Sequence, residues 1–193
     1  MLSLLRPALV SVGLFTLLLG LAYPLAITGV AQAAFPRQAD GSLIMQDGRI
    51  VGSALVGQAF ASPRYLHGRP SAVGYDAAGS GASNLGPLNA ELIAETSARA
   101  KAWRAETAGA EPPADAVTAS ASGLDPHVSP ANALAQAPRI AEARGADVER
   151  VRAVIAQHVE GRTFGVLGQP RVNVLRTNLA LDAALAPEQP APQ

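Results

Sequence analysis

An uncharged apolar run near the N-terminus, residues 7–30, constrains this chain more than any other feature of its sequence. As a helix, about 23 such residues measure roughly 35 Å, enough to cross a hydrocarbon core of about 30 Å with some tilt. Pro24 lies inside the run, where neighbouring membrane helices can satisfy the carbonyl that it frees. The run therefore predicts one membrane-spanning helix at about residues 8–30.

The same segment also fits a cleavable signal peptide. Arg6 supplies a basic start, residues 14–21 a short apolar core, and Ala31-Gln32-Ala33 a small-residue cleavage pattern. The length of the run favours a retained anchor, but both interpretations export the rest of the chain. Arg6 is the only basic residue before the run and Arg37 follows soon after it, so the positive-inside rule leans toward a cytoplasmic N-terminus.

The remaining residues, about 160, suffice for one domain with a hydrophobic core. We expect an N-terminal segment at 1–33, a single extracytoplasmic α+β domain at 34–186 and a disordered tail at 187–193. With 15 basic and 15 acidic residues and 4% aromatics, the chain has neither the charge nor the stacking platform of a nucleic-acid-binding protein. It contains no cysteine, which excludes disulfides, thiolate metal sites and cysteine nucleophiles.

Local patterns place a small sheet and three or four helices in this domain. Asp47-Gly48 between two short apolar runs predicts a hairpin, and an irregular segment follows at 57–86. A strand is expected at 172–174 because its residues alternate. Helices are expected at 88–105, at 129–144 with a break at Pro138 and an end at Gly145, from an Asp147 cap to Gly161 with Val159 on the apolar face, and from an Asn178 cap to Leu185.

The helix at 88–105 is expected to bury a stripe formed by Leu92, Ile93, Ala100 and Trp103. In this interpretation Trp103 anchors the core.

Several common catalytic and cofactor motifs are missing. The only lysine, Lys101, lies in a predicted helix, so no P-loop exists, and no Asp-Lys-Thr-Gly-Thr phosphorylation sequence is present. Residues 79–84 imitate a dinucleotide-binding loop but place Asn84 at the third glycine. The three histidines lack a second ligand at metal-binding spacing.

One cluster resembles the components of a hydrolase. Ser122, Asp125 and His127 lie within six residues, but such triads usually draw on separate elements, and no G-x-S-x-G elbow is present. The alternative is a turn at 123–126 followed by a helix cap at Ser129. Neither explains two long polar tracts, residues 69–89 and 118–144, and loops of that length tend to carry binding surfaces.

Six segments in and around these tracts stand out as specific motifs: Phe-Pro-Arg-Gln-Ala-Asp-Gly-Ser-Leu-Ile (35–44), Arg-Pro-Ser-Ala (69–72), Ser-Gly-Ala-Ser-Asn-Leu-Gly-Pro (80–87), Thr-Ala-Ser-Ala-Ser-Gly-Leu-Asp-Pro-His (118–127), Gln-Ala-Pro-Arg-Ile-Ala-Glu-Ala-Arg (136–144) and Val-Asn-Val-Leu (172–175). In these segments the chain resembles the C subunit of the bacterial Kdp potassium-transporting ATPase, and the similarity extends over nearly its whole length. The family usually has a second glycine where Ala82 stands, and an alanine there would be strained if the position required a positive φ.

The resemblance implies a non-catalytic accessory subunit of an ATP-driven potassium importer in the cell inner membrane, with its helix retained. Its partners would be a potassium-conducting subunit, a P-type ATPase subunit, a small membrane peptide and the lipid bilayer. It would bind no cofactor itself, since ATP is used by the complex and potassium is the transported ion. The family has been described as a catalytic chaperone that raises the ATP affinity of the ATPase subunit.

For that role the resemblance points to Gln136 as a nucleotide contact. With a cytoplasmic N-terminus and a single span, Gln136 would lie on the outer side of the membrane, where it cannot meet cytoplasmic ATP. This topology instead favours a domain that packs over the outer mouth of the potassium-conducting subunit. The candidate partner contacts are Arg69, Ser71, Ser83, Asn84, Ser120, Gly123, Asp125 and His127. A secreted hydrolase and a free extracytoplasmic binding module are the alternatives.

Overall fold

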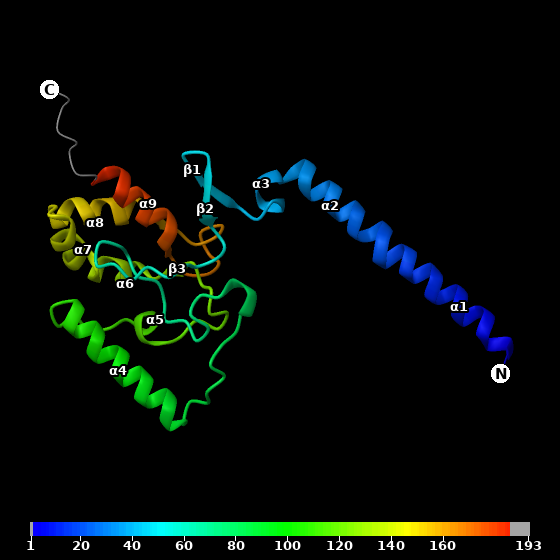
Figure 1. Cartoon of the computed structure of the whole chain (residues 1–193), viewed down its shortest axis with the longest axis horizontal. Helices are drawn as coiled ribbons and strands as arrows, with labels where there is room; N and C mark the ends of the chain where they lie inside the picture. The colour runs from blue at the N-terminus through cyan, green and yellow to red at the C-terminus, as the bar shows by residue number, and fades with distance from the viewer. Residues whose placement is uncertain (1, 186–193) are drawn as a thin grey trace. The chain divides into compact units, whose positions relative to one another are not determined.

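The computed structural model describes residues 2–185, drawn as ribbon in Figure 1. Two compact units make up the chain, residues 1–53 and 54–193, and each is described by itself. The predicted tail at 187–193 lies outside the described residues.

The first unit begins with the apolar helix. It consists of α1 (Leu2–Leu17), a π-helical segment η1 (Leu18–Ala22) and α2 (Tyr23–Ala34). The stretch Ser3–Ala34 is long and apolar enough to cross a membrane, with a mean hydropathy of 2.0. The predicted helix is confirmed and extends beyond 8–30 at both ends. The π segment lies directly before Pro24, which has no N–H and displaces the carbonyl four residues earlier, so a wider turn there accommodates the ring.

A hairpin follows the helix. After the short α3 (Pro36–Ala39), strands β1 (Leu43–Gln46) and β2 (Arg49–Ser53) pair antiparallel. Asp47 and Gly48 both have positive φ, at 49° and 74°, which is the mirror-image turn that suits the twist of two paired strands. The predicted hairpin is confirmed.

The second unit is built on a three-stranded antiparallel sheet with the order β3 (His127–Val128), β5 (Arg171–Asn173), β4 (Val159–Glu160). Its core is formed by the sheet with α6 (Pro130–Ala135), α7 (Ala137–Arg144), α8 (Val148–Gln157) and α9 (Val174–Ala184). Fully buried aliphatic side chains fill this core: Leu66, Ile140, Val151, Ile155, Val172 and Leu181. The α+β fold class is confirmed, and the helices are more numerous and shorter than the three or four expected.

Local capping signals place the central helices as predicted. The hydroxyl of Ser129 accepts the N–H of Asn132 at the start of α6, and Asp147 accepts the N–H of Glu149 at the start of α8. The helical segment is interrupted between α6 and α7, just before Pro138, and Gly145 ends α7 with a φ of 63°.

Two predicted helix boundaries are wrong. The helix capped by Asp147 ends at Gln157, and Val159 belongs to strand β4 because it pairs with Val172. The last helix begins at Val174 and is capped by Asn173, so strand β5 passes into α9 without a loop. Asn178 is buried inside α9 instead.

Helix α4 (Ala90–Glu106) is correctly placed and capped by Asn89, but its predicted buried stripe is wrong. None of its residues is fully buried, and Ile93 is 57% exposed. α4 packs mainly on the short α5 (Ala114–Val117), which covers too little of it to bury a stripe. Trp103 is half-buried and lies outside the main core.

The segment at 57–86 is irregular, as expected, apart from one 3-10 turn, η2 (Ala77–Gly79). Ala82 does not have a positive φ, so replacing the family's usual glycine strains nothing there. The residues with left-handed backbone in this stretch are Gly74, Tyr75 and Asn84, at φ values of 61°, 62° and 55°.

Candidate functional site

Two loops that are distant in sequence, residues 69–81 and 118–126, lie side by side in the second unit. We call them the interlocked loops. Main-chain bonds join them to each other and to their surroundings, from N–H to carbonyl: Ser120 to Pro70 at 2.9 Å, Gly81 to Ser122 at 2.9 Å, Gly57 to Leu124 at 2.8 Å and Val174 to Pro126 at 2.9 Å. The structure thus combines parts of the two polar tracts into one surface.

Ser71 and Gly123 form the tightest contact between these loops. The Ser71 hydroxyl donates to the carbonyl of Gly123 at 2.7 Å and accepts the N–H groups of Val73 and Tyr75. Gly123 has a φ of 68°, and a Cβ there would lie 2.8 Å from the carbonyl oxygen of Gly81. The position therefore requires glycine for both its conformation and its space.

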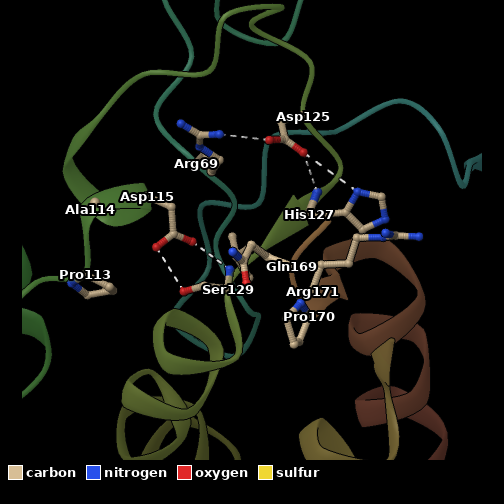
Figure 2. A pocket seen from close by; sticks show the side chains of 11 residues that line it. Arg69, Pro113, Ala114, Asp115, Asp125, His127, Ser129, Gln169, Pro170 and Arg171 are labelled. Carbon is tan, nitrogen blue, oxygen red and sulfur yellow. Dashed lines mark hydrogen bonds and ion pairs between the residues drawn. The ribbon is translucent and has the colours of Figure 1, made fainter. Parts of the chain in front are cut away.

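Arg69 connects the loops through its guanidinium. One terminal nitrogen donates to Asp125 Oδ2 at 3.0 Å, and the other lies 3.3 Å from the hydroxyl of Thr118. The second oxygen of Asp125 accepts the backbone N–H of His127 at 3.0 Å, so the carboxylate joins an arginine to the start of β3 (Figure 2). This predicted trio is brought together by the structure.

A pocket of about 610 Å³ opens beside Arg69 and His127. Asp115, from α5, lies on its wall and accepts both the N–H and the hydroxyl of Ser129, at 2.6 and 3.0 Å (Figure 2). Arg171, on the other side, is paired with Glu160 at 3.0 Å. The charged groups of this pocket therefore already have ion-pair or hydrogen-bond partners. Within residues 2–185, no group of three His, Asp or Glu side chains could hold a metal ion.

The surroundings of His127 favour its neutral form. Burial lowers its pKa, and the positive charges of Arg171 and Arg176 act in the same direction, while Glu160 and Asp125 partly oppose them. A neutral imidazole suits this position because Asn173 Nδ2 lies 3.4 Å from His127 Nε2.

Gln136 lies at the junction of α6 and α7 and is only 2% exposed. Its side-chain oxygen Oε1 accepts the backbone N–H of His67 at 2.9 Å and a guanidinium N–H of Arg139 at 2.6 Å. Its amide nitrogen donates to Asn132 Oδ1 at 2.6 Å and to the carbonyl of His67 at 3.2 Å. All four hydrogen-bonding positions of the side chain are thus occupied inside the protein.

His67 shares this network. His67 Nε2 lies 3.0 Å from a guanidinium nitrogen of Arg139, which can only donate, and 3.1 Å from the carbonyl oxygen of Ser62, which can only accept. Burial lowers the pKa of His67 and the charge of Arg139 lowers it further, while the hydrogen bond to the Ser62 carbonyl and the charge of Glu106 oppose this. A cavity of about 180 Å³ adjoins the network and is lined by Trp103, whose buried indole N–H has no hydrogen-bond partner among the described residues.

The other predicted residues have separate roles. Ser120 is buried and its hydroxyl lies 3.1 Å from that of Ser122, which also accepts the N–H of Leu124. Ser83 and Asn84 lie in the extended stretch before α4, where the Asn84 amide bonds only within its own loop, to Ala82. Ser83 and Asn84 therefore lie outside the bonded group of Arg69, Asp125 and His127.

The hydrolase arrangement does not form among the described residues. Asp125 is close to His127, with 3.8 Å between Oδ1 and Nδ1, but no hydrogen bond joins Ser122 to His127. Nucleophile and base are therefore not coupled as a triad requires.

Sequence reasoning missed Tyr75 and Asp115. Tyr75 has a left-handed φ of 62° and its hydroxyl donates to the carbonyl of Arg69 at 2.6 Å, and burial raises its pKa. Gly57 and Gly68 leave room for this ring, since a Cβ on Gly57 would meet it at 2.9 Å. No local pattern marks either residue, because Asp115 bonds to Ser129, 14 residues away, and the Tyr75 ring lies beside Gly57 and Gly68, in a part of the loop with no regular period.

Comparison with known proteins agrees with the resemblance. The KdpC family model, described as K+-transporting ATPase, c chain, matches residues 5–183. A potassium-transporting ATPase KdpC subunit from Caulobacter vibrioides strain NA1000 / CB15N is 64% identical over 190 residues, covering 97% of this chain and 96% of the relative. Proteins of the same description from Cereibacter sphaeroides strain ATCC 17029 and Beijerinckia indica are 59% and 54% identical, over 95% and 98% of this chain and 99% and 98% of theirs. Because the family model spans nearly the whole chain and these relatives share more than half of its residues, the chain belongs to the KdpC family.

Proposed function

We propose that this chain is a non-catalytic accessory subunit of an ATP-driven potassium importer in the cell inner membrane. Its helix stays in the bilayer with a cytoplasmic N-terminus, and the second unit lies outside the cytoplasm. It assembles with a potassium-conducting subunit, a P-type ATPase subunit and a small membrane peptide. The family membership and the apolar stretch Ser3–Ala34 support this assignment.

The interlocked loops are the surface that we expect to meet the potassium-conducting subunit, over its outer mouth. Their bonding supports this role, because Ser71, Arg69 and Gly123 hold an otherwise irregular surface in one conformation. A surface fixed in advance loses less entropy when it binds a partner. The domain would thereby stabilise the complex and restrain ion entry.

A direct nucleotide contact by Gln136 has little structural support. The side chain is buried and its hydrogen bonds are saturated by Asn132, His67 and Arg139. To meet a nucleotide it would have to give up these bonds. Any effect of this position on ATP affinity would be indirect, through the shape of the domain.

Cross-linking tests the proposed contact, and the absence of cysteine makes single-cysteine variants straightforward. Ala78→Cys and Ala121→Cys are exposed positions in the interlocked loops, and Ala153→Cys is an exposed control on α8. In the assembled complex, a photoactivated cross-linker on residues 78 and 121 should reach the potassium-conducting subunit far more often than one on residue 153. Equal yields, or a product from residue 153 alone, would contradict the proposal.

A further inference from the structure

A small hairpin between β4 and β5 exposes three apolar side chains in a fixed conformation. We call residues 163–167 the apolar tip. Thr163 and Leu167 exchange both N–H to carbonyl bonds, each at 2.9 Å, so the tip has a defined backbone. Phe164 is 89%, Val166 71% and Leu167 58% exposed.

Phe164 is also in an unfavourable conformation. Its φ is 53° and that of Gly165 is 76°, the pair of values for which hairpins usually select Asn-Gly or Asp-Gly. A bulky residue in the left-handed region costs free energy, and an exposed ring recovers none of it by packing. The aromatic side chain at this position is therefore not explained by the folding of the domain.

The charges around the tip favour a lipid surface over other occupants. Residues 161–171 contain two arginines and no acidic residue. Arg171 is paired with Glu160, whereas Arg162 bonds to the neutral Gln169 and has no ion pair among the described residues. A protruding apolar tip with an uncompensated cation beside it is the combination that binds the interface of an anionic bilayer.

The apolar helix adds a second argument. A chain anchored by Ser3–Ala34 holds its remaining residues close to the bilayer surface, so even a weak contact is occupied at high effective concentration. We propose that the apolar tip inserts into the interface of the membrane that holds the helix, as a second attachment of the second unit to the bilayer. This contact is independent of the proposed docking of the interlocked loops.

Fluorescence in vesicles tests this with the full-length chain. Val166→Cys and the exposed control Ala153→Cys are labelled with the same environment-sensitive dye and reconstituted into vesicles of phosphatidylcholine and phosphatidylglycerol that carry a headgroup-level nitroxide lipid. The dye at residue 166 should shift to the blue and be quenched by the nitroxide lipid, and the dye at residue 153 should not. Adding Phe164→Asn to the Val166→Cys chain should reduce the bound fraction relative to the unbound about tenfold, because one buried ring is lost.

The Phe164→Asn variant separates binding from folding. Asparagine tolerates the left-handed conformation, so the variant should unfold at the same or higher urea concentration than the parent chain while losing quenching. Absence of quenching at residue 166 overturns the proposal, as does equal quenching at residue 153. A dye that becomes shielded only when the other subunits are added, without lipid quenching, would assign the tip to a protein partner and also overturn it.

Discussion

Gln136 is the position at which a structural and a nucleotide-binding role make opposite predictions. The variant Gln136→Leu keeps the size of the side chain but removes four hydrogen bonds, and it leaves Asn132 Oδ1 and the main-chain groups of His67 without partners in a buried place. A net 0.5–1.5 kcal/mol for each bond, with the cost of unsatisfied groups, places the expected loss of unfolding free energy at about 3–5 kcal/mol. A domain of typical stability survives that loss in folded form.

Urea unfolding of the full chain in mild detergent measures this loss. Trp103 is the only tryptophan and lines the cavity next to Gln136, so its fluorescence reports on the affected region. Gln157→Leu, at an exposed position of α8, is the matched control and should change the unfolding free energy by less than about 0.5 kcal/mol. If Gln136→Leu unfolds like the native chain yet weakens ATP binding in the assembled complex, the structural role is refuted.

Two further predictions concern the same unit. Gly123→Ala should lower the free energy of unfolding in urea by about 2 kcal/mol or more, because it places a methyl group against the loop around Gly81 at a position of positive φ. The control Gly161→Ala, where the added methyl group meets open space, should lower it by less than about 1 kcal/mol. Equal losses in the two variants would contradict this reasoning. Burial and the charge of Arg139 lower the pKa of His67 in the folded protein, so folding favours the neutral imidazole. The resulting stability is present above the unfolded pKa of about 6.5 and is lost as pH falls through the lower folded pKa. His67→Gln should therefore flatten the pH dependence of unfolding below about pH 6.5, and an unchanged profile would argue against the burial of His67 and its contact with Arg139.

The sequence predicted the elements whose signals are local. The hairpin at Asp47-Gly48, the caps Ser129 and Asp147, and the stop at Gly145 depend on residues within a few positions of each other, and all are confirmed. The motifs in the two polar tracts indicate the family by themselves, independently of any tertiary contact.

Long-range contacts account for what the sequence could not give. Asn178 has a side chain that can cap a helix, but its amide accepts the N–H of Leu66 at 2.7 Å and donates to the carbonyl of Leu66 at 3.0 Å. Asn173 caps the helix instead. Val159 continues the helical period, yet pairing with Val172 draws it into the sheet. The bonds between Gln136 and His67 and those between the interlocked loops join residues about 40 to 70 positions apart, so no local pattern indicates them.

The short strand β3 ends its sheet and has a neighbour on one side only, β5. Because Val174 bonds to the carbonyl of Pro126, the N–H groups of His127 and Ser129 face the open side. The carboxylates of Asp125 and Asp115 take both of these donors. An incoming strand therefore finds both N–H donors of this edge already bonded, which disfavours the association of copies of this chain through strand addition.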